Sequence, residues 1–217
     1  MKNTLYFIVL LSFFSCDNIP EDGFTKLVGE AQGTTFYISY LDSLNTDYSA
    51  DIQLILENFD QELSTYKPGS LINKINNNEI DSIPSDEEYF MNCYNLSKRI
   101  HSYTNGYFNP GLQNLLQVSS EYNKRGELLP QEMRDSLLKI PARIGGFKSM
   151  RKVDKRTQFN FNAIAQGYSV DVISDFLESK GVDNYMVEIG GEVRAAGKNG
   201  DRPWRIGIEA PSSDGLR

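Results

Sequence analysis

Two hydrophobic periods alternate along this chain. Short segments rich in β-branched and aromatic residues, as expected of strands, come in neighbouring pairs bounded by Gly, Asn or Asp. Between these pairs lie longer segments whose apolar residues recur at helical spacing. Hairpins interspersed with helices predict an α+β fold with antiparallel or mixed sheets and packed helices, rather than a doubly wound parallel sheet.

The strands expected from this pattern lie in three groups. They are two strands around Gly33 within 26–41, three at 143–148, 151–153 and 158–161, and three at 185–189, 192–196 and 204–209. Asp154-Lys155-Arg156 fits a hairpin turn in the middle group, and Gly190-Gly191 fits a tight turn in the last.

Five helices are expected between and after these strands. They are 49–64, 70–77, a helix that begins with a capping box at Ser85 and ends at Asn105-Gly106, 130–140 and 163–179. His101 lies near the end of the third helix, where we interpret it as a partly exposed side chain that interacts favourably with the helix dipole.

Composition excludes several classes of function. The net charge of −7 and the scattered Lys and Arg residues argue against nucleic acid or an anionic membrane surface as partner. His101 is the single histidine, so neither a His/Cys metal cluster nor a Ser-His-Asp triad can form. Any metal ion must therefore be held mainly by oxygen ligands.

The N-terminus resembles a bacterial lipoprotein signal. Lys2 precedes an apolar run of ten residues from Leu5 to Phe14, followed by Ser15 and Cys16. This run is about half of the ~20 residues that a membrane-spanning helix needs. We expect residues 1–15 to be a signal peptide, residues 16–25 to be the lipidated Cys16 with a spacer, and the protein to be exported and membrane-anchored, facing the periplasm. The alternative is an ordinary cleaved signal followed by a free cysteine. With Cys16 lipidated, Cys93 alone remains, and no intramolecular disulfide can form.

Five stretches, in order, resemble the FAD:protein FMN transferase family, also called the ApbE family. They are QGTTF at 32–36, LSTYKPGS at 63–70, NGYFNP at 105–110, NFNAIAQGYSVD at 160–171, and VEIGGEVR at 187–194 with WRIGIEAP at 204–211. The resemblance implies an ApbE-like T-fold for residues 26–217, with the C-terminal third of the family missing.

The resemblance also implies a set of site residues. Those expected to contact FAD are Gln32, Tyr66, Tyr107, Phe108, Asn109, Asn160 and Gln166, and Ala163 is expected to offer its backbone oxygen to Mg²⁺. A strand giving way to a helix near Ala163 suits a pyrophosphate, because unpaired N–H groups face outward there. Exposed aromatic rings on turns suit flavin or adenine stacking, with core packing as the alternative for each ring. Gly190-Gly191 is either part of this site or a purely structural turn.

Three residues depart from the common family pattern. Asn109 and Asn160 stand where aspartate is usual, and Gln166 stands where a charged residue, often lysine, is usual. These changes remove charge but keep hydrogen-bonding capacity. The family continues past residue 217 with further magnesium ligands, so we expect weak metal binding and poor transfer by this chain alone.

The expected function is magnesium-dependent transfer of FMN from FAD to a threonine of an acceptor protein, with release of AMP. A redox-pump subunit is one candidate acceptor, but the sequence does not identify it. Two alternatives stay open: a lipid-anchored FAD-binding remnant without transferase activity, and a surface lipoprotein with a structural or carbohydrate-binding role. Bound flavin and transfer to an acceptor distinguish the three.

Overall fold

The computed structural model describes residues 23–80, 82–84, 87–145 and 151–208. The central element is a four-stranded antiparallel sheet with the order β1-β2-β5-β6. Its strands are β1 (Thr25–Ala31), β2 (Thr34–Leu41), β5 (Asn184–Ile189) and β6 (Glu192–Ala196). Alternate side chains of β5, Tyr185, Val187 and Ile189, are buried, whereas Met186 and Glu188 between them are partly exposed. This two-residue period assigns one face of the sheet to the core.

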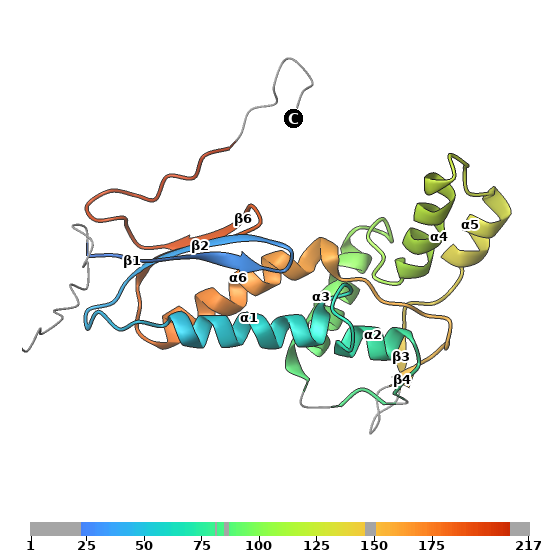
Figure 1. The fold of residues 1–217 in the computed structure, drawn as a ribbon, viewed down its shortest axis with the longest axis horizontal. Coiled ribbons are helices and arrows are strands. Elements are labelled where there is room, and N and C mark those ends of the chain that lie inside the picture. Colours follow the sequence, from blue (N-terminus) through green and yellow to red (C-terminus); the bar gives the residue numbers. More distant parts are fainter. Residues whose placement is uncertain (1–22, 81, 85–86, 146–150, 209–217) are drawn as a thin grey trace, which may run out of the picture.

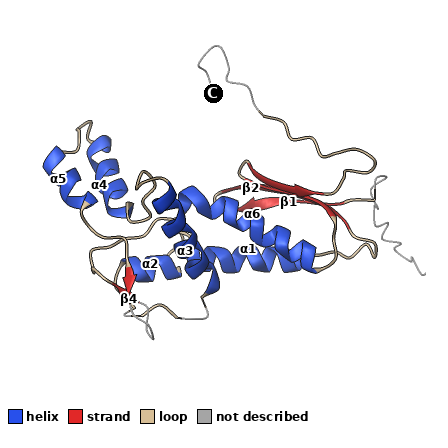
Figure 2. Ribbon diagram, turned by 180° about the vertical axis from the view of Figure 1, so that it is seen from behind, coloured by secondary structure: helices blue, strands red, loops and turns tan. Residues whose placement is uncertain are grey.

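Two long helices cover that face, α1 (Ser49–Leu63) and α6 (Asn162–Ser179), as Figures 1 and 2 show. Ile52 and Leu56 of α1, and Ile173 and Leu177 of α6, pack against the buried side chains of β2 and β5. Their spacing places each set on a single helical face. The sheet and these two helices therefore share one hydrophobic core.

A second core lies at the far end of the two long helices. It joins the end of α1 to α2 (Leu71–Asn76), α3 (Glu88–Tyr103) and the segment before α6. Phe90 of α3 contacts Phe159 and Phe161 with centroid distances of 6.1 and 5.4 Å, both edge-on. The start of α6 is thereby held beside the end of α1.

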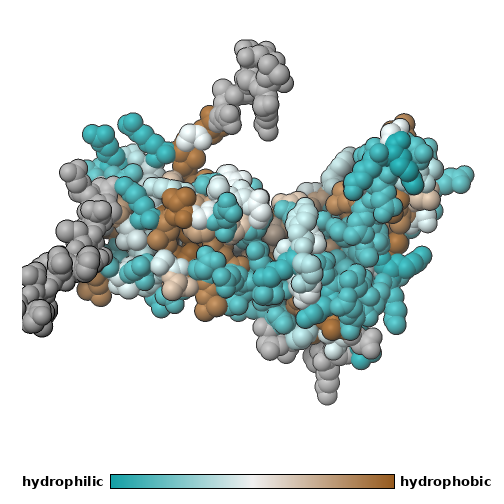
Figure 3. Space-filling view, in the orientation of Figure 1, coloured by the Kyte–Doolittle hydropathy of each residue, from teal (hydrophilic) through white to brown (hydrophobic). Residues whose placement is uncertain are grey.

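A helical hairpin projects from this end of the molecule (Figure 1). It consists of α4 (Gln113–Lys124) and α5 (Gln131–Leu138), and no described residue of either helix is buried. In Figure 3 its surface is mostly hydrophilic, with scattered apolar patches. We call this hairpin the α4–α5 arm.

Most of the expected elements are confirmed. Both hairpins of the main sheet, α1, α2, α3, α5 and α6 lie within a few residues of their predicted positions, and the α+β class is correct. His101 is in the last turn of α3, as interpreted. Of the predicted capping box, Ser85 and Asp86 fall outside the described residues. The sequence analysis did not predict α4, whose apolar residues are all at least partly exposed.

The middle group of strands was predicted correctly only in part: strands lie within 143–148 and 151–153, residues 146–148 fall outside the described residues, and the hairpin turn and the third strand are wrong. The small sheet pairs β3 (Ile144–Gly145) with β4 (Arg151–Lys152), so Asp154-Lys155-Arg156 follows the second strand instead of joining two strands. Residues 158–161 form no strand, because other groups satisfy their backbone. The Asn76 side-chain amide accepts from the Phe159 N–H at 2.7 Å and donates to the Phe159 carbonyl at 2.9 Å. The Asn160 N–H donates to the Pro110 carbonyl.

The last predicted strand is also wrong within the described residues. Residues 204–208 run past β6 without regular structure. Trp204 is held by its indole N–H, which donates to the Ala196 carbonyl at 2.8 Å, and by edge-on contact with Phe24. Ile206 and Ile208 are exposed, so the alternating pattern that predicted a strand is not used for pairing here.

Candidate functional site

Two tight turns meet at one end of the main sheet. Gln32-Gly33 joins β1 to β2, and Gly190-Gly191 joins β5 to β6. All four residues have positive φ, as in the type I′ turns that close two-residue hairpins. The Gly190 N–H donates to the Thr35 carbonyl at 3.1 Å, which holds the two turns side by side.

Gln32 is an unusual residue for such a turn. Its φ is 56°, in the left-handed region that favours Gly or Asn. Both polar atoms of its side-chain amide are buried and have no hydrogen-bond partner in the described part of the chain. A strained backbone and an unsatisfied buried amide both lower the stability of the fold, and such features are found at ligand sites.

The turn between α1 and α2 forms the second part of the site and displays Tyr66. Ser64 Oγ accepts from the N–H groups of Tyr66 and Lys67 at 3.3 and 3.2 Å. The Asn73 side-chain amide donates to the carbonyls of Thr65 and Lys67 at 3.3 and 3.0 Å. Tyr66 is 84% exposed, so a rigid turn presents its ring to solvent.

The start of α6 forms the third part of the site. Asn160 Oδ1 accepts from the Asn162 N–H at 2.9 Å, and Asn160 Nδ2 donates to Gln113 Oε1 at 2.7 Å. Ala163 is exposed in the first turn of the helix. One turn later, the Gln166 side chain lies against Gly190, where an added Cβ would come within 2.9 Å of Gln166 Nε2. Gly190 therefore leaves room for Gln166, so this turn belongs to the site's structure.

These three parts enclose two adjoining hollows. A cleft of about 180 Å³ is lined by Gln32, Asp60, Ser64, Tyr66, Asn162 and Gln166, with apolar floor residues. A more open groove of about 810 Å³ is lined by Thr65, Tyr66, Asn160, Asn162, Ala163 and one face of α4. Tyr66 and Asn162 line both hollows. The structure thus brings together five of the predicted residues: Gln32, Tyr66, Asn160, Ala163 and Gln166.

Asp60 is a charged residue of the cleft that the sequence analysis missed. Burial raises the pKa of its carboxyl, opposed by the Lys67 ammonium and the Gln32 backbone N–H. In the sequence, Asp60 is one of several polar residues on an amphipathic helix, and only the fold shows which of them faces the cleft. The cleft wall therefore combines a partly desolvated carboxyl with neutral amides and a nearby ammonium group.

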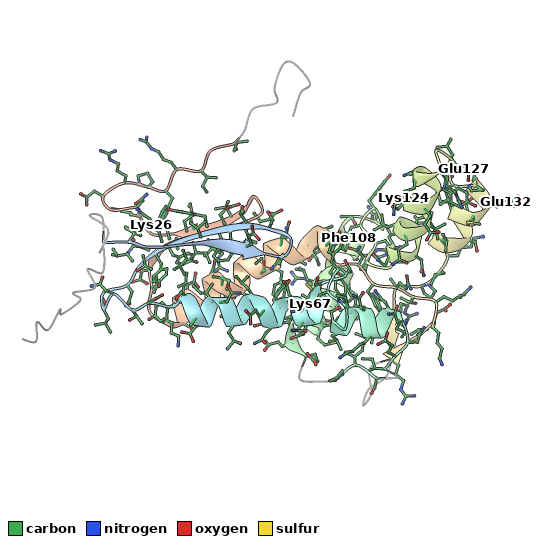
Figure 4. All side chains as sticks on the ribbon, in the orientation of Figure 1. Lys26, Lys67, Phe108, Lys124, Glu127 and Glu132 are labelled. Carbon is green, nitrogen blue, oxygen red and sulfur yellow. The ribbon has the colours of Figure 1, made fainter. Side chains whose placement is uncertain are left out.

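The other predicted contacts lie apart from these hollows. Tyr107 is 94% exposed, and neither Tyr107 nor Phe108 lines the cleft or the groove. Phe108 lies in the loop from α3 to α4 (Figure 4), where its carbonyl accepts from His101 Nδ1 at 2.6 Å. Asn109 lines a different hollow and accepts from the Gly111 N–H. Contact of these three residues with FAD stays a prediction.

The described residues do not by themselves fit a magnesium site. Within them, no group of three or more His, Cys, Asp or Glu side chains is placed to hold a metal ion. Ala163 offers at most one neutral carbonyl, whereas Mg²⁺ is usually bound by one or two carboxylates together with phosphate oxygens and waters. In the described residues, no helix has the length and hydropathy of a membrane span.

Solved structures with this fold define the class of protein. The flavin transferase ApbE from Vibrio cholerae superposes with a TM-score of 0.72 at 27% identity, over 89% of this chain and 66% of that one. The apo flavinyl transferase ApbE of Pseudomonas stutzeri gives 0.73 at 28% identity, over 87% and 64%. The fold is therefore the one found in flavin transferases.

Sequence comparison identifies the family. The ApbE family model matches residues 32–217, and this chain belongs to that family. The FAD:protein FMN transferase of Vibrio cholerae is 31% identical over 235 residues, which cover 99% of this chain and 67% of the relative. That of Haemophilus influenzae is 29% identical, over 95% and 64%. The chain spans about two thirds of the length of these relatives.

Proposed function

We propose that this chain binds FAD in the cleft and groove around Tyr66, as part of an enzyme that transfers FMN from FAD to an acceptor protein. The names of the relatives support FAD as donor and a protein as acceptor. The observation that carries the proposal is the buried, unpaired Gln32 amide in a cleft shared with Tyr66 and Gln166. A ligand with polar edges on a flat ring would satisfy that amide and stack on the exposed tyrosine.

The groove suits the diphosphate of FAD. At the start of α6 the Asn162 N–H donates to Asn160 Oδ1 and the Ile164 N–H to the Phe161 carbonyl, so the Ala163 N–H is available to a ligand, and the helix dipole favours negative charge there. Asn162 and Ala163, at this helix start, line the groove next to Tyr66. In the proposed reaction, the hydroxyl oxygen of an acceptor threonine bonds to the FMN-side phosphorus. The bond from that phosphorus to the bridging oxygen breaks, AMP leaves with that oxygen, and the hydroxyl proton is lost to the surroundings.

Magnesium enters this proposal only through the resemblance to the family. When bound to a diphosphate, such an ion neutralises charge that grows on the leaving group. Because the described residues do not fit a metal site, no step here depends on it. We expect a chelator to change the FAD affinity of this chain by less than about twofold, measured by titration with and without Mg²⁺. A large loss of affinity would show that the metal is needed to hold the diphosphate.

Tyr66→Ala tests the binding site. If the ring stacks on the flavin or adenine, its removal should weaken FAD binding by about 1 kcal/mol, which is roughly fivefold in Kd. Tyr103→Ala is the matched control, because Tyr103 is also exposed but lies on α3 and lines neither hollow. Fluorescence titration of both folded variants checks this, and equal affinities would remove Tyr66 from the site.

An assay of FMN transfer distinguishes a transferase from an FAD-binding remnant without transferase activity. The neutral residues Asn109, Asn160 and Gln166 favour the remnant for this chain alone, because less charge is available to stabilise a transition state. Incubation of FAD with a threonine-containing acceptor protein, followed by mass spectrometry, measures transfer. We expect residues 17–217 to bind FAD and to leave the acceptor unmodified. Efficient flavinylation by this chain would contradict that expectation.

We also propose that the protein is exported and held on a membrane by a lipid on Cys16, facing the periplasm. The n-region, the short apolar run and the cysteine support this proposal. In a bacterial host, Cys16→Ser should release the protein from the membrane fraction, because two or three acyl chains would otherwise hold it there. Unchanged sedimentation of a processed Cys16→Ser variant would disprove lipidation.

A further inference from the structure

We propose that a second hollow, distinct from the cleft and the groove around Tyr66, binds a small anion with an apolar body. It lies between α3, the Asn109-Pro110 turn and residues 138–144, and has a volume of about 580 Å³. It shares no lining residue with the cleft or the groove. We call it the α3 hollow.

Specific contacts preform its walls. Tyr94 Oη accepts from the Ile144 N–H at 2.8 Å, which attaches residues 138–144 to α3. At a second point, Gly111 packs so tightly on Ala142 that an added Cβ would lie 2.6 Å from the Ala142 Cβ. Asn109 Oδ1 accepts from the Gly111 N–H at 2.9 Å and braces the turn. A hollow held open at three points is available to a ligand without prior rearrangement.

Half of the lining is apolar. These residues come from the turn, from the last residue of α5 and from the segment that follows it: Pro110, Leu138, Ile140, Pro141, Ala142 and Ile144. Leu138 is 46% exposed, so part of this apolar surface is in contact with water. Covering it with a hydrocarbon or ring would remove that apolar surface from water, which is favourable.

The charged lining residues are all basic or potentially basic. They are Lys98, His101, Lys139 and Arg143, and no carboxylate of the described residues lines the hollow, although the chain carries a net charge of −7. Lys98 Nζ lies 5.5 Å from the Tyr94 ring centroid, and Lys98, Lys139 and Arg143 form no ion pair with any described residue. His101 Nδ1 is engaged with the Phe108 carbonyl, which leaves Nε2 as its remaining polar atom.

This combination selects the class of ligand. Unpaired cations at the edge of an apolar hollow attract an anionic group, and the apolar walls favour a hydrocarbon or ring attached to it. The volume is within the range of drug-sized ligand sites, about 300–1,000 Å³. The ligand is therefore a soluble phosphate or carboxylate on an apolar body.

Three probes distinguish the contribution of the anionic group from that of the apolar body: 1-naphthyl phosphate has both, inorganic phosphate has only the first and 1-naphthol only the second. Calorimetric titration of the whole chain should give a Kd for naphthyl phosphate at least tenfold below that for either partial probe. Lys98→Glu and Arg143→Glu should each weaken naphthyl phosphate about fivefold or more. Lys74→Glu makes the same charge change on the exposed face of α2, outside the hollow, and should have little effect. Lys98→Gln is the milder variant if a reversal disturbs folding, which circular dichroism checks.

Several results would overturn the proposal. One is naphthyl phosphate binding no tighter than the partial probes, and another is equal weakening by Lys74→Glu. Displacement of the probe by FAD would show that the α3 hollow belongs to the flavin site. Binding only to vesicles of phosphatidylglycerol, and not to the soluble probe, would identify a lipid surface instead.

Discussion

Gln32 combines two local costs that a purely structural turn would avoid. Its left-handed backbone disfavours an L side chain by about 1–2 kcal/mol, and its buried amide lacks partners in the described chain. Gly is preferred at such positions, although it lowers stability through the greater freedom of the unfolded chain. We interpret Gln32 as a residue retained for ligand contact at the expense of stability.

Gln32→Gly should therefore both raise the stability of the fold and weaken FAD binding. We expect about 1 kcal/mol of stabilisation in denaturant unfolding, because relief of strain and of the unpaired amide exceeds the added chain entropy. Asn45→Gly is the matched control, since Asn45 also has a positive φ of 51° and lies in an exposed loop away from the site. A destabilised Gln32→Gly variant with unchanged FAD affinity would mean that the side chain serves the turn.

At the scale of elements, Glu62 of α1 connects to the start of α3. Its carboxylate accepts from the Phe90 N–H at 2.8 Å. Glu62 therefore caps the start of α3, because Glu87 at the N-cap position forms no side-chain cap hydrogen bond. Burial raises the pKa of Glu62 from its ordinary 4.5 to about 7, helped by the Glu87 and Glu88 carboxylates and opposed by the Phe90 and Tyr89 N–H groups. The protonated form is thus favoured in the folded state, so this group's contribution to stability falls as pH rises from about 4.5 to 7.

Glu62→Gln should remove that pH dependence, because the amide keeps an acceptor for Phe90 and carries no charge. Relative to the unmodified chain, the free energy of unfolding of Glu62→Gln should rise only slightly near pH 5 and most above pH 7, by at most about 3 kcal/mol. Urea unfolding from pH 5 to 8 measures it. Glu121→Gln on the exposed side of α4 should show no such trend, and a Glu62→Gln curve parallel to the unmodified one would refute the assignment.

The α4–α5 arm is held to the body by few polar contacts. Asn160 Nδ2 donates to Gln113 Oε1 at 2.7 Å, and Asn114 Nδ2 donates to the Arg156 carbonyl at 2.6 Å. Asn160 therefore contributes one of these two contacts, with its amide as the donor. With no buried residue in either helix, we expect arm amides to exchange far faster than those of α6.

Asn160→Ala should accelerate exchange in α4 further, because it removes the hydrogen bond to Gln113. Hydrogen exchange followed by mass spectrometry measures this change, with Asn123→Ala at the exposed end of α4 as control. If both variants exchange alike, the Asn160 contact does not hold the arm.

At the scale of the whole molecule, strong periodicity made much of the fold predictable. The main-sheet hairpins and the helices α1, α3 and α6 have apolar residues at regular spacing, and the family assignment is confirmed by the family model. The errors arose where tertiary contacts replaced regular pairing. Asn76 satisfies the backbone of Phe159 from 83 residues away, which no local pattern reveals.

The candidate site was predictable only in part. The resemblance named Gln32, Tyr66, Asn160, Ala163 and Gln166, and the fold brings them together. It gave no indication of Asp60, because a carboxylate on a helix face becomes part of a cleft only when the β1–β2 turn packs beside it. The pairing of Asn160 with Gln113 likewise depends on the position of the α4–α5 arm.

A hydrogen-exchange footprint with and without FAD tests whether FAD occupies the cleft and groove around Tyr66. Protection should appear in the Gln32-Gly33 turn, in residues 64–67 and at the start of α6, because these segments line the two hollows. The wall of the α3 hollow at residues 138–144 should be unaffected. Unchanged exchange in all three segments at saturating FAD, or protection confined to other parts of the chain, would contradict the account.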